Sequence, residues 1–395
     1  MKITIIGGGF SGLSFAFYSP NENCKLTIIE KENSLGGLAS SFRYNSYNLD
    51  RFYHCILSSD KELLQFISDN GLSQKIFWEY TTMGFWIDKK IFPLNTAFDL
   101  LRFSPLPFFD RIKAGYSFLK LNYERNIEKL ESITAENLLV EYFGNKAFSY
   151  IWKPLLISKF GEKYSNVPAT WVWGRLKRQT ETKEKKSGAD KTAYIDGGFA
   201  SLISAIEKNL LEKKTTIIKG VKAEKIEERK NGALIVYLSD GSIIESDIII
   251  STVPYPDQPE IVSSQAGKEK KIQKIDYQGV VCLLLICKQK LSNHYWIPIV
   301  NDHIPFAGVV ETTNLITPLQ NRNINLIYLM DYTSKKETFE LTTETIYKKW
   351  VKYIPELFPS FSLNSIKDFF VFKAHAVEPI AILNYSKIKP QYEII

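Results

Sequence analysis

The pattern of apolar and polar residues at the start of the chain predicts a strand, a turn, a helix and a second strand. Residues 3–6 form the β-branched run "ITII", three glycines follow, and "LSFAFY" has helical character. A second apolar run, "KLTIIE", ends at Glu30. These elements in this order predict a βαβ unit.

A later stretch alternates between polar turns and β-rich runs. Asn231-Gly232 and Asp240-Gly241 are dipeptides typical of two-residue hairpin turns, and they separate three short runs. The apolar run "DIIIS" that follows has the length of a strand. We therefore predict a β-meander inserted before the last strand of a domain that begins at residue 2 and is completed near residue 254.

The segment between these two parts reads as mainly helical. Ser59 and Glu62 have the spacing of a capping box ahead of apolar residues at helical spacing, and Gly71 supplies a stop. The charged run "QTETKEKKSGAD" (179–190) lacks apolar residues, which predicts a mobile loop. Beyond residue 254, the apolar runs "GVVCLLLIC" and "INLIYLMDY" predict strands.

Residues 100–125, "LLRFSPLPFFDRIKAGYSFLKLNYER", interleave aromatic and basic side chains. We interpret this stretch as a packed helix whose Lys and Arg side chains extend to solvent. The alternative is a helix that lies on a membrane surface, since the same pattern suits interfacial helices.

Composition indicates a globular protein of two or three domains: 395 residues, 45% of them apolar and 24% charged. The net charge of +7 is spread along the chain, which is compatible with an anionic cofactor or substrate and gives no basic stripe for nucleic acid. No apolar run approaches the roughly 20 residues of a transmembrane helix. The cysteines, which read as unpaired reduced thiols, predict a cytoplasmic protein.

Four cysteines are present: Cys24, Cys55, Cys282 and Cys287. The last two have the C-x4-C spacing of some flavin-reductase redox pairs, but they lie in a run that reads as a buried strand. Residues five apart on a strand point to opposite faces, so we predict buried, unpaired thiols. The four histidines lack metal-ligand spacing, and no metal site is predicted.

The glycines after the first strand, Gly7, Gly9 and Gly12, fit the G-x-G-x-x-G pattern, and Glu30 follows Gly12 by 18 residues. In this pattern the first glycine permits a tight turn and the second lets the backbone approach a pyrophosphate. The third allows close packing of helix on strand, and the acid binds ribose hydroxyls. A secretion signal is the competing interpretation, but the glycines interrupt its apolar core and no convincing cleavage site follows.

A second glycine pair, Gly36-Gly37, lies shortly downstream in "EKENSLGGLASSF", where a second backbone loop could pass close to the dinucleotide. No second G-x-G-x-x-G occurs, which argues against a separate pyridine-nucleotide domain. FAD is therefore the predicted cofactor.

The motifs "GGGFSGL", "EKENSLGGLASSF", "YIDGGFASLISAI" and "DIIISTVP" together resemble the flavin-containing amine oxidase and protoporphyrinogen oxidase superfamily. The resemblance implies an α/β fold: a Rossmann-like FAD-binding domain (parallel sheet plus β-meander) with an inserted helical segment and a β-rich substrate domain. It assigns residues 1–58 and 192–254 to the FAD-binding domain, 59–191 to the mainly helical segment and 255–375 to a mixed α/β substrate-binding domain. The implied cofactor-binding residues are Gly7, Gly9, Phe10, Ser11, Gly12, Glu30, Lys31, Gly36, Gly37, Leu38 and Ala223.

The middle of the chain is more similar to UDP-galactopyranose mutase, a relative within this superfamily. "YHCILSSDKELLQFI" resembles the loop that brings a histidine near the flavin, here His54, and "SKFGEKYSNVPATWVWGRL" ends at Arg175, which matches a diphosphate-binding arginine. The mutase's second arginine, ahead of a glutamate that matches Glu311, is replaced by Gly308. Amine oxidases have an arginine where this chain has Leu38.

The resemblance also implies site chemistry. Lys159 matches a lysine that lies near the flavin in amine oxidases, so His54 and Lys159 are the candidate catalytic residues and Arg175 and Glu311 the candidate substrate-binding residues. Relatives continue beyond the region of residue 380 into a segment that closes over the flavin, whereas this sequence stops at Ile395.

The expected activity is hydride transfer from a small-molecule substrate to FAD, since a flavin accepts a hydride directly. The substrate could be lipid-soluble, or a nucleotide-sugar if the protein is a redox-neutral sugar mutase. A flavin-binding protein or fragment without catalysis is the third alternative. The sequence does not predict the oligomeric state.

Overall fold

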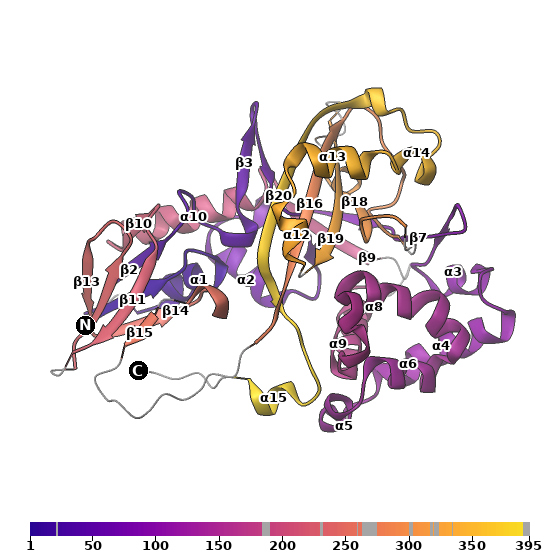
Figure 1. Cartoon of the computed structure of the whole chain (residues 1–395), viewed down its shortest axis with the longest axis horizontal. Helices are drawn as coiled ribbons and strands as arrows, with labels where there is room; N and C mark the ends of the chain where they lie inside the picture. The colour runs from indigo at the N-terminus through magenta and orange to yellow at the C-terminus, as the bar shows by residue number, and fades with distance from the viewer. Residues whose placement is uncertain are drawn as a thin grey trace.

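The computed structural model describes residues 1–20, 23–183, 190–229, 232–258, 260–262, 275–299, 303–316, 319, 324–333 and 335–389. Figure 1 shows a dinucleotide-type sheet and its meander on one side, a group of helices on another, and a large antiparallel sheet between them. This architecture confirms the predicted α/β fold with a parallel sheet and a β-meander.

The first sheet is parallel and has the strand order β10-β2-β1-β14. Its strands are rich in isoleucine, and those of β1 and β2 are buried because helices pack against the sheet. The meander lies beside it as the sheet β13-β12-β11-β15. The elements of this part are β1 (Lys2–Ile6), α1 (Phe10–Tyr18), β2 (Lys25–Glu30), β3 (Ser41–Tyr44), β4 (Tyr47–Asp50), α10 (Phe199–Glu212), β10 (Thr216–Lys219), β11 (Ala223–Glu228), β12 (Leu234–Leu238), β13 (Ile243–Ser246), β14 (Ile248–Ser251) and β15 (Glu260–Val262).

The turn between β12 and β13 differs from the predicted two-residue form. The Leu238 N–H donates to the Ser242 carbonyl at 3.0 Å, so three residues form the loop. Gly241 has φ +85°, which fits a type I turn followed by a left-handed residue. Asn231, in the other predicted turn, lies outside the described residues.

The segment predicted to be mainly helical contains strands before its helices. Strands β5 and β6 and the hairpin β7-β8 precede the helices α3 to α9, and β9, which follows them, pairs between β5 and β6. The elements are β5 (Ile56–Leu57), α2 (Lys61–Asp69), β6 (Ile76–Thr81), β7 (Gly84–Ile87), β8 (Lys90–Pro93), α3 (Ala97–Arg102), α4 (Phe108–Asn122), α5 (Ile127–Ser132), α6 (Ala135–Phe143), α7 (Asn145–Ala147), α8 (Lys153–Phe160), α9 (Ala169–Thr182) and β9 (Asp190–Ile195). The mobile loop predicted over 179–190 falls largely on 184–189, outside the described residues; its first residues belong to α9.

The capping box predicted at Ser59 and Glu62 is wrong. The N-cap of α2 is Asp60, one residue later, and Gly71 with φ +73° follows the helix as expected. The Ser59 hydroxyl is 3.0 Å from the Thr182 hydroxyl of α9 instead. The Ser59 side chain therefore makes a tertiary hydrogen bond to α9 instead of capping α2.

The third part is an antiparallel sheet with the order β17-β18-β19-β16-β20. Strand β16, between β19 and β20, is buried on both faces, so Cys282 packs in the core shared with the parallel sheet and Cys287 in the core under α13 and α14. Both thiols are free, as predicted. The elements are β16 (Tyr277–Cys287), β17 (Trp296–Pro298), β18 (Gly308–Glu311), β19 (Asn325–Thr333), α12 (Lys336–Glu340), α13 (Thr343–Val351), α14 (Ile354–Leu357), β20 (Ile366–Pro379) and α15 (Tyr385–Ile388).

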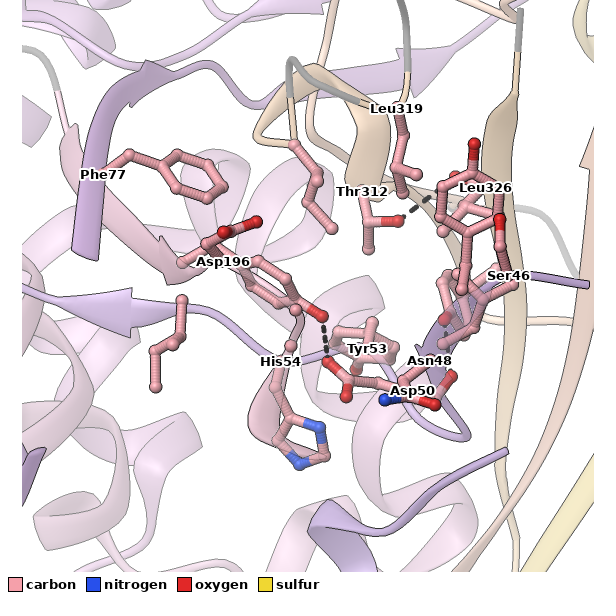
Figure 2. A pocket seen from close by; sticks show the side chains of 18 residues that line it. Ser46, Asn48, Asp50, Tyr53, His54, Phe77, Asp196, Thr312, Leu319 and Leu326 are labelled. Atoms are coloured by element: carbon pink, nitrogen blue, oxygen red, sulfur yellow. Dashed lines mark hydrogen bonds between the residues drawn. The ribbon is translucent and has the colours of Figure 1, made fainter. Parts of the chain in front are cut away.

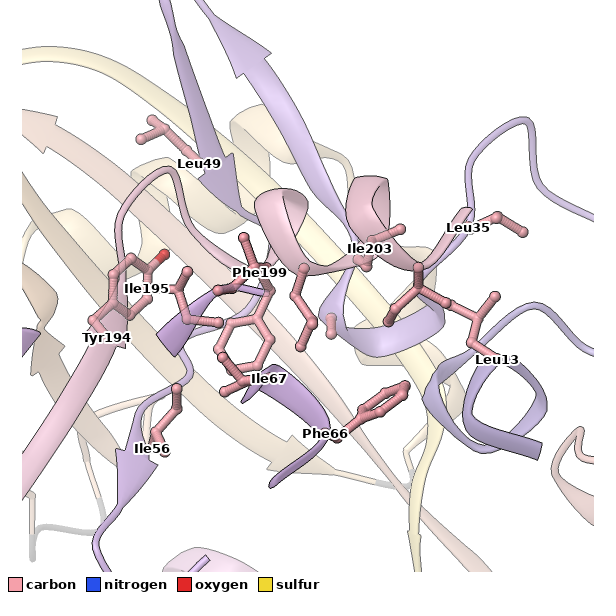
Figure 3. Close-up of a cluster of buried hydrophobic side chains, with 14 of the residues drawn as sticks. Leu13, Leu35, Leu49, Ile56, Phe66, Ile67, Tyr194, Ile195, Phe199 and Ile203 are labelled. Atoms are coloured by element: carbon pink, nitrogen blue, oxygen red, sulfur yellow. The ribbon is translucent and has the colours of Figure 1, made fainter. Parts of the chain in front are cut away.

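One hydrophobic core joins the first sheet to the antiparallel sheets. Figure 3 shows Leu13 of α1, Phe66 of α2 and Phe199 of α10 in this core. Phe10 contacts Phe66 and Phe199 edge-on, with ring centroids 6.4 and 5.8 Å apart. These contacts hold the start of α1, next to the glycine turn, against α2 and α10.

Candidate flavin and substrate site

The glycine turn has the geometry of a close strand-to-helix connection. Gly7 has φ +107°, and its N–H donates to the Ile29 carbonyl of β2 at 2.9 Å. A Cβ added to Gly12 would lie 2.0 Å from the Gly7 carbonyl oxygen. Only glycine at this helical position lets α1 lie so close to the turn.

The N-terminus of α1 is available to an anion. Its N-cap is Gly9, and no side chain of the described residues caps it. The first N–H groups of the helix, at Phe10, Ser11 and Gly12, precede the first intrahelical bond, which runs from the Leu13 N–H to the Gly9 carbonyl at 3.0 Å. Uncapped N–H groups and the positive end of the helix dipole together favour a phosphate.

Glu30 lies at the carboxyl end of β2 and is 7% exposed. One carboxylate oxygen accepts the Gly8 N–H at 2.7 Å, and the other accepts the Glu32 N–H at 2.9 Å. These bonds leave further lone pairs for ribose hydroxyls, which an ionised carboxylate accepts well. The neighbouring Lys31 is oriented to Asp257, 3.0 Å away, in an exposed ion pair.

The second glycine pair packs directly on the first turn. The Gly36 N–H donates to the Gly8 carbonyl at 2.8 Å, and a Cβ on Gly37 would lie 3.2 Å from the Gly9 Cα. Gly36 and Gly37 have φ of +112° and +54°, so both positions favour glycine. Leu38 follows on the surface, 39% exposed.

Ala223 begins β11 beside the Glu30 end of the sheet. The Val221 N–H donates to the Glu30 carbonyl at 3.2 Å, which holds this strand start next to the residue that carries the buried carboxylate. The structure therefore brings together the predicted cofactor residues of three distant segments. Their geometry fits a dinucleotide: a turn without side chains, an uncapped helix and a buried acid.

His54 lies beyond this turn, next to a cavity of about 330 Å³. Its ring is 5.3 Å from that of Phe199, which also contacts Phe10. Burial lowers the pKa of His54, so the imidazole is neutral at pH 7. Its Nδ1 lies 2.9 Å from the Phe52 carbonyl oxygen, which can only accept. Nδ1 therefore carries the proton, and Nε2 is the acceptor.

Asp50, which sequence reasoning missed, contributes a buried carboxylate to the same cavity (Figure 2). The Tyr194 hydroxyl donates to its carboxylate, and the Tyr328 hydroxyl donates to its backbone carbonyl at 2.7 Å. Burial raises the pKa of Asp50 to about 7, although Tyr194 and the Phe199 N–H lower it. Nothing in "YNLDRF" marks this aspartate, because its tyrosine partners come from distant strands.

Lys159 belongs to a second polar cluster, between α8 and the last strands. Its Nζ is 2.8 Å from a Glu378 carboxylate oxygen and 3.8 Å from the centre of the Tyr332 ring. The Tyr332 hydroxyl is hydrogen-bonded to the hydroxyl of Tyr53, the neighbour of His54. The two predicted catalytic residues therefore lie at the ends of one short chain of contacts.

Arg175 of α9 lies near the same carboxylate. Its guanidinium carbon is 5.2 Å from the centre of the Trp171 ring, and the Trp171 Nε1 donates to Glu378 at 3.1 Å. Burial would raise the pKa of Glu378, but Lys159, Trp171 and Arg175 outweigh it and lower that pKa. Two cations thus face a single ionised carboxylate.

Glu311 does not join this cluster. Its buried carboxylate accepts the N–H groups of Leu291 and Ser292 at 3.2 and 2.9 Å, which favours a structural role over the predicted substrate contact. Burial raises its pKa to about 7. A Cβ on Gly308 would make a tight contact, 3.2 Å from the Ile297 carbonyl oxygen, and glycine has no side chain that could take the role of the mutase's second arginine.

The glycine turn, the buried acid and the second glycine pair define a protein of the dinucleotide-binding α/β class. The chain belongs to the flavin containing amine oxidoreductase family, whose model matches residues 10–381. FAD is its cofactor. No curated protein sequence matches the chain.

Three solved structures share the fold. A protein from Exiguobacterium sp. 255-15, provisionally assigned as a protoporphyrinogen oxidase, has a TM-score of 0.75 and 14% identity over 98% of this chain and 89% of its own. Reduced UDP-galactopyranose mutase has a TM-score of 0.74 and 17% identity, with coverage of 98% and 86%. An oxidoreductase from Methanosarcina mazei has a TM-score of 0.71 and 17% identity, with coverage of 95% and 89%.

No helix within the described ranges is both long and apolar enough to cross a membrane.

Proposed function

We propose that this enzyme oxidises a small organic substrate that carries an anionic group, by hydride transfer to FAD. The substrate would bind between α8, α9 and the ends of β19 and β20. The observation that carries this proposal is the cluster of Lys159, Arg175 and Glu378, in which two cations and one carboxylate leave one positive charge in excess. A guanidinium fork suits a carboxylate or phosphate on the substrate.

Bound flavin supplies the hydride acceptor. The protein's part is to position the substrate and to manage protons. Glu378 keeps Lys159 in place, the Tyr53–Tyr332 contact joins the cluster to the cavity, and neutral His54 offers Nε2 as a proton acceptor. Residues 1–58 and 192–254 would form the flavin-binding part, and the helical segment would cover the substrate.

The first test is flavin reduction under anaerobic conditions. The FAD-loaded protein is mixed with a panel of amines, porphyrinogens and organic acids, and the loss of flavin absorbance is followed. Bleaching by one of these classes is the expected result. If the protein shows an intact flavin spectrum and none of these compounds bleaches it, the result would contradict net oxidation of such a substrate.

The anion site is tested separately. Arg175→Ala should raise the KM of an anionic bleaching substrate about ten-fold and leave kcat unchanged, because a charge-assisted hydrogen bond is lost. Lys177→Ala is the matched control, since Lys177 is on the same helix but lies over Trp173. Equal changes of KM in the two variants would show that Arg175 does not bind the substrate.

The second candidate is a redox-neutral sugar mutase, favoured by the match of Arg175 and by the fold shared with UDP-galactopyranose mutase. The glycine at position 308, where the mutase has its second arginine, argues against a two-arginine diphosphate site. Tight binding of a UDP-sugar to the reduced protein alone would support the mutase over the oxidase.

A further inference from the structure

Helix α4 packs one face on the helical core, where Leu121 is buried and Phe118 contacts Phe143, and exposes a second apolar face to solvent. Ala114, Ser117 and Leu121 are buried, and the Ser117 hydroxyl donates to the Tyr142 carbonyl of α6. The exposed side chains of α4 and its C-cap are Phe108 (57%), Phe109 (82%), Ile112 (48%), Tyr116 (67%), Leu119 (65%) and Tyr123 (77%). The helix is packed, as expected, and it carries a second apolar face that the packing leaves exposed.

The exposed residues form one continuous stripe. At about 100° per residue, they occupy an arc of roughly 100° on the helix surface. Phe98 and Leu101 of the adjoining α3 are also exposed, at 57% and 45%. We call these eight residues the α4 face. Single exposed apolar residues are ordinary, whereas a continuous face marks an interaction surface.

The charges around the α4 face are basic. On the same helical projection, Lys113 and Lys120 border one edge of the stripe and Arg111 borders the other. Arg102 lies over the Phe98 ring at 3.8 Å. Asp99, by contrast, is used in the capping box of α3. Aromatic and aliphatic residues bordered by Lys and Arg match the interface of an anionic bilayer.

The position of the helix leaves this face open. In Figure 1, α4 lies on the outer side of the helical segment, with α8 and α9 toward the sheets. Helix α4 packs on α6 and α9, while α8 contacts β19. The Arg111 guanidinium donates to the Leu106 and Leu101 carbonyls at 2.6 and 2.8 Å. The cations that this face offers to a bilayer are therefore Lys113 and Lys120, along one edge of the stripe.

We propose that the α4 face is a membrane-binding surface, which docks the enzyme on the surface of an anionic lipid bilayer. The apolar side chains would enter the headgroup region while Lys113 and Lys120 contact lipid phosphates. This proposal does not depend on the identity of the substrate. Because its test measures binding to vesicles, the membrane proposal can fail while the proposed function stands.

The test is co-flotation of the FAD-loaded full chain with vesicles. One set contains about equal parts of phosphatidylglycerol and phosphatidylcholine, and the other contains phosphatidylcholine alone. The expected result is flotation with the anionic set, weakened by salt. Phe109→Ser with Leu119→Ser should lower binding by at least about ten-fold, because two inserted side chains are lost.

The matched control is Leu211→Ser with Ile243→Ser, which removes two apolar side chains exposed by 54% and 57% elsewhere. It should bind as the parent does. Lys113→Gln with Lys120→Gln should lower binding to anionic vesicles on the order of ten-fold. Because all these positions are exposed, unchanged flavin content verifies folding.

Three outcomes would overturn the proposal. The parent protein could fail to float with anionic vesicles, or the control pair could lose as much binding as the α4 pair. Light scattering could instead show a dimer that Phe109→Ser with Leu119→Ser dissociates, which would assign the face to a second copy of the chain.

Discussion

Gly12 shows how a single missing side chain positions the cofactor site. It lies in the first turn of α1, where a Cβ would meet the Gly7 carbonyl oxygen at 2.0 Å. That atom belongs to the backbone, so no side-chain rotation can relieve the contact. The helix and the turn must separate if any other residue is present.

We predict that Gly12→Ala lowers the free energy of unfolding by about 3 kcal/mol and abolishes FAD retention, because overpacking displaces the turn. Gly174→Ala is the control, since Gly174 is also helical and a Cβ there meets nothing within 4 Å. It should be neutral or stabilise by about 0.5 to 1 kcal/mol. Urea unfolding and the flavin absorbance of the purified proteins measure both effects, and retention of FAD by Gly12→Ala would contradict the geometry.

The predictability of single residues follows the range of their contacts. Gly7, Gly9, Gly12 and Glu30 were recognisable because their roles depend on a short βαβ unit. The partners of Lys159 were not, since Glu378 and Tyr332 lie far along the chain on other strands. No local pattern encodes an ion pair between such distant positions.

At the scale of elements, β16 decides the chemistry of two cysteines. Cys282 and Cys287 are five residues apart on one strand and belong to different cores. Burial raises the pKa of both thiols, that of Cys287 to about 12. A protonated thiol in a core is a poor nucleophile and a poor redox group.

We predict that Cys282→Ala with Cys287→Ala leaves the rate of flavin reduction by substrate unchanged and costs about 1 kcal/mol of stability per site. Thiol labelling of the denatured parent protein, prepared without reductant, should detect all four cysteines. Detection of two fewer thiols in the parent, together with slower flavin reduction in the variant, would support the interpretation that Cys282 and Cys287 form a redox pair.

Element boundaries were less predictable than element types. The strands "GVVCLLLIC" and "INLIYLMDY" were evident from their apolar runs, whereas the start of α2 was misplaced by one residue. There Asp60 accepts the Leu57 N–H at 3.0 Å and pairs with Arg178 of α9 at 2.8 Å. A contact between two helices thus outweighed the local capping pattern.

At the scale of the whole molecule, buried acids set the response of stability to pH. Burial raises the pKa of Asp50 from 3.8 to about 7, and those of Glu311 and Asp331 to about 7 and about 6. Between the unfolded and folded pKa values the native state binds more protons than the unfolded state. Stability is therefore greatest at the acidic end of this range and falls as the pH rises toward 7.

We predict that Asp50→Asn removes about 3 kcal/mol of the decline in unfolding free energy between about pH 5 and about pH 8. Asp69→Asn is the control: the Tyr18 hydroxyl lowers the pKa of Asp69, which therefore titrates below this range. Urea unfolding at a series of pH values measures the decline. An unchanged slope in Asp50→Asn would place the pH dependence on other groups.

The sequence by itself determined the βαβ unit, the glycine turn with the acid that follows it, the meander and the buried strands, because each depends on neighbours within a few tens of residues. Tertiary structure alone decided which polar groups meet. It joined Lys159 to Glu378, surrounded Asp50 with tyrosines and tied Glu311 to the backbone. It also decided that the apolar stripe of α4 points outward, since periodicity identifies an apolar face but not what covers it.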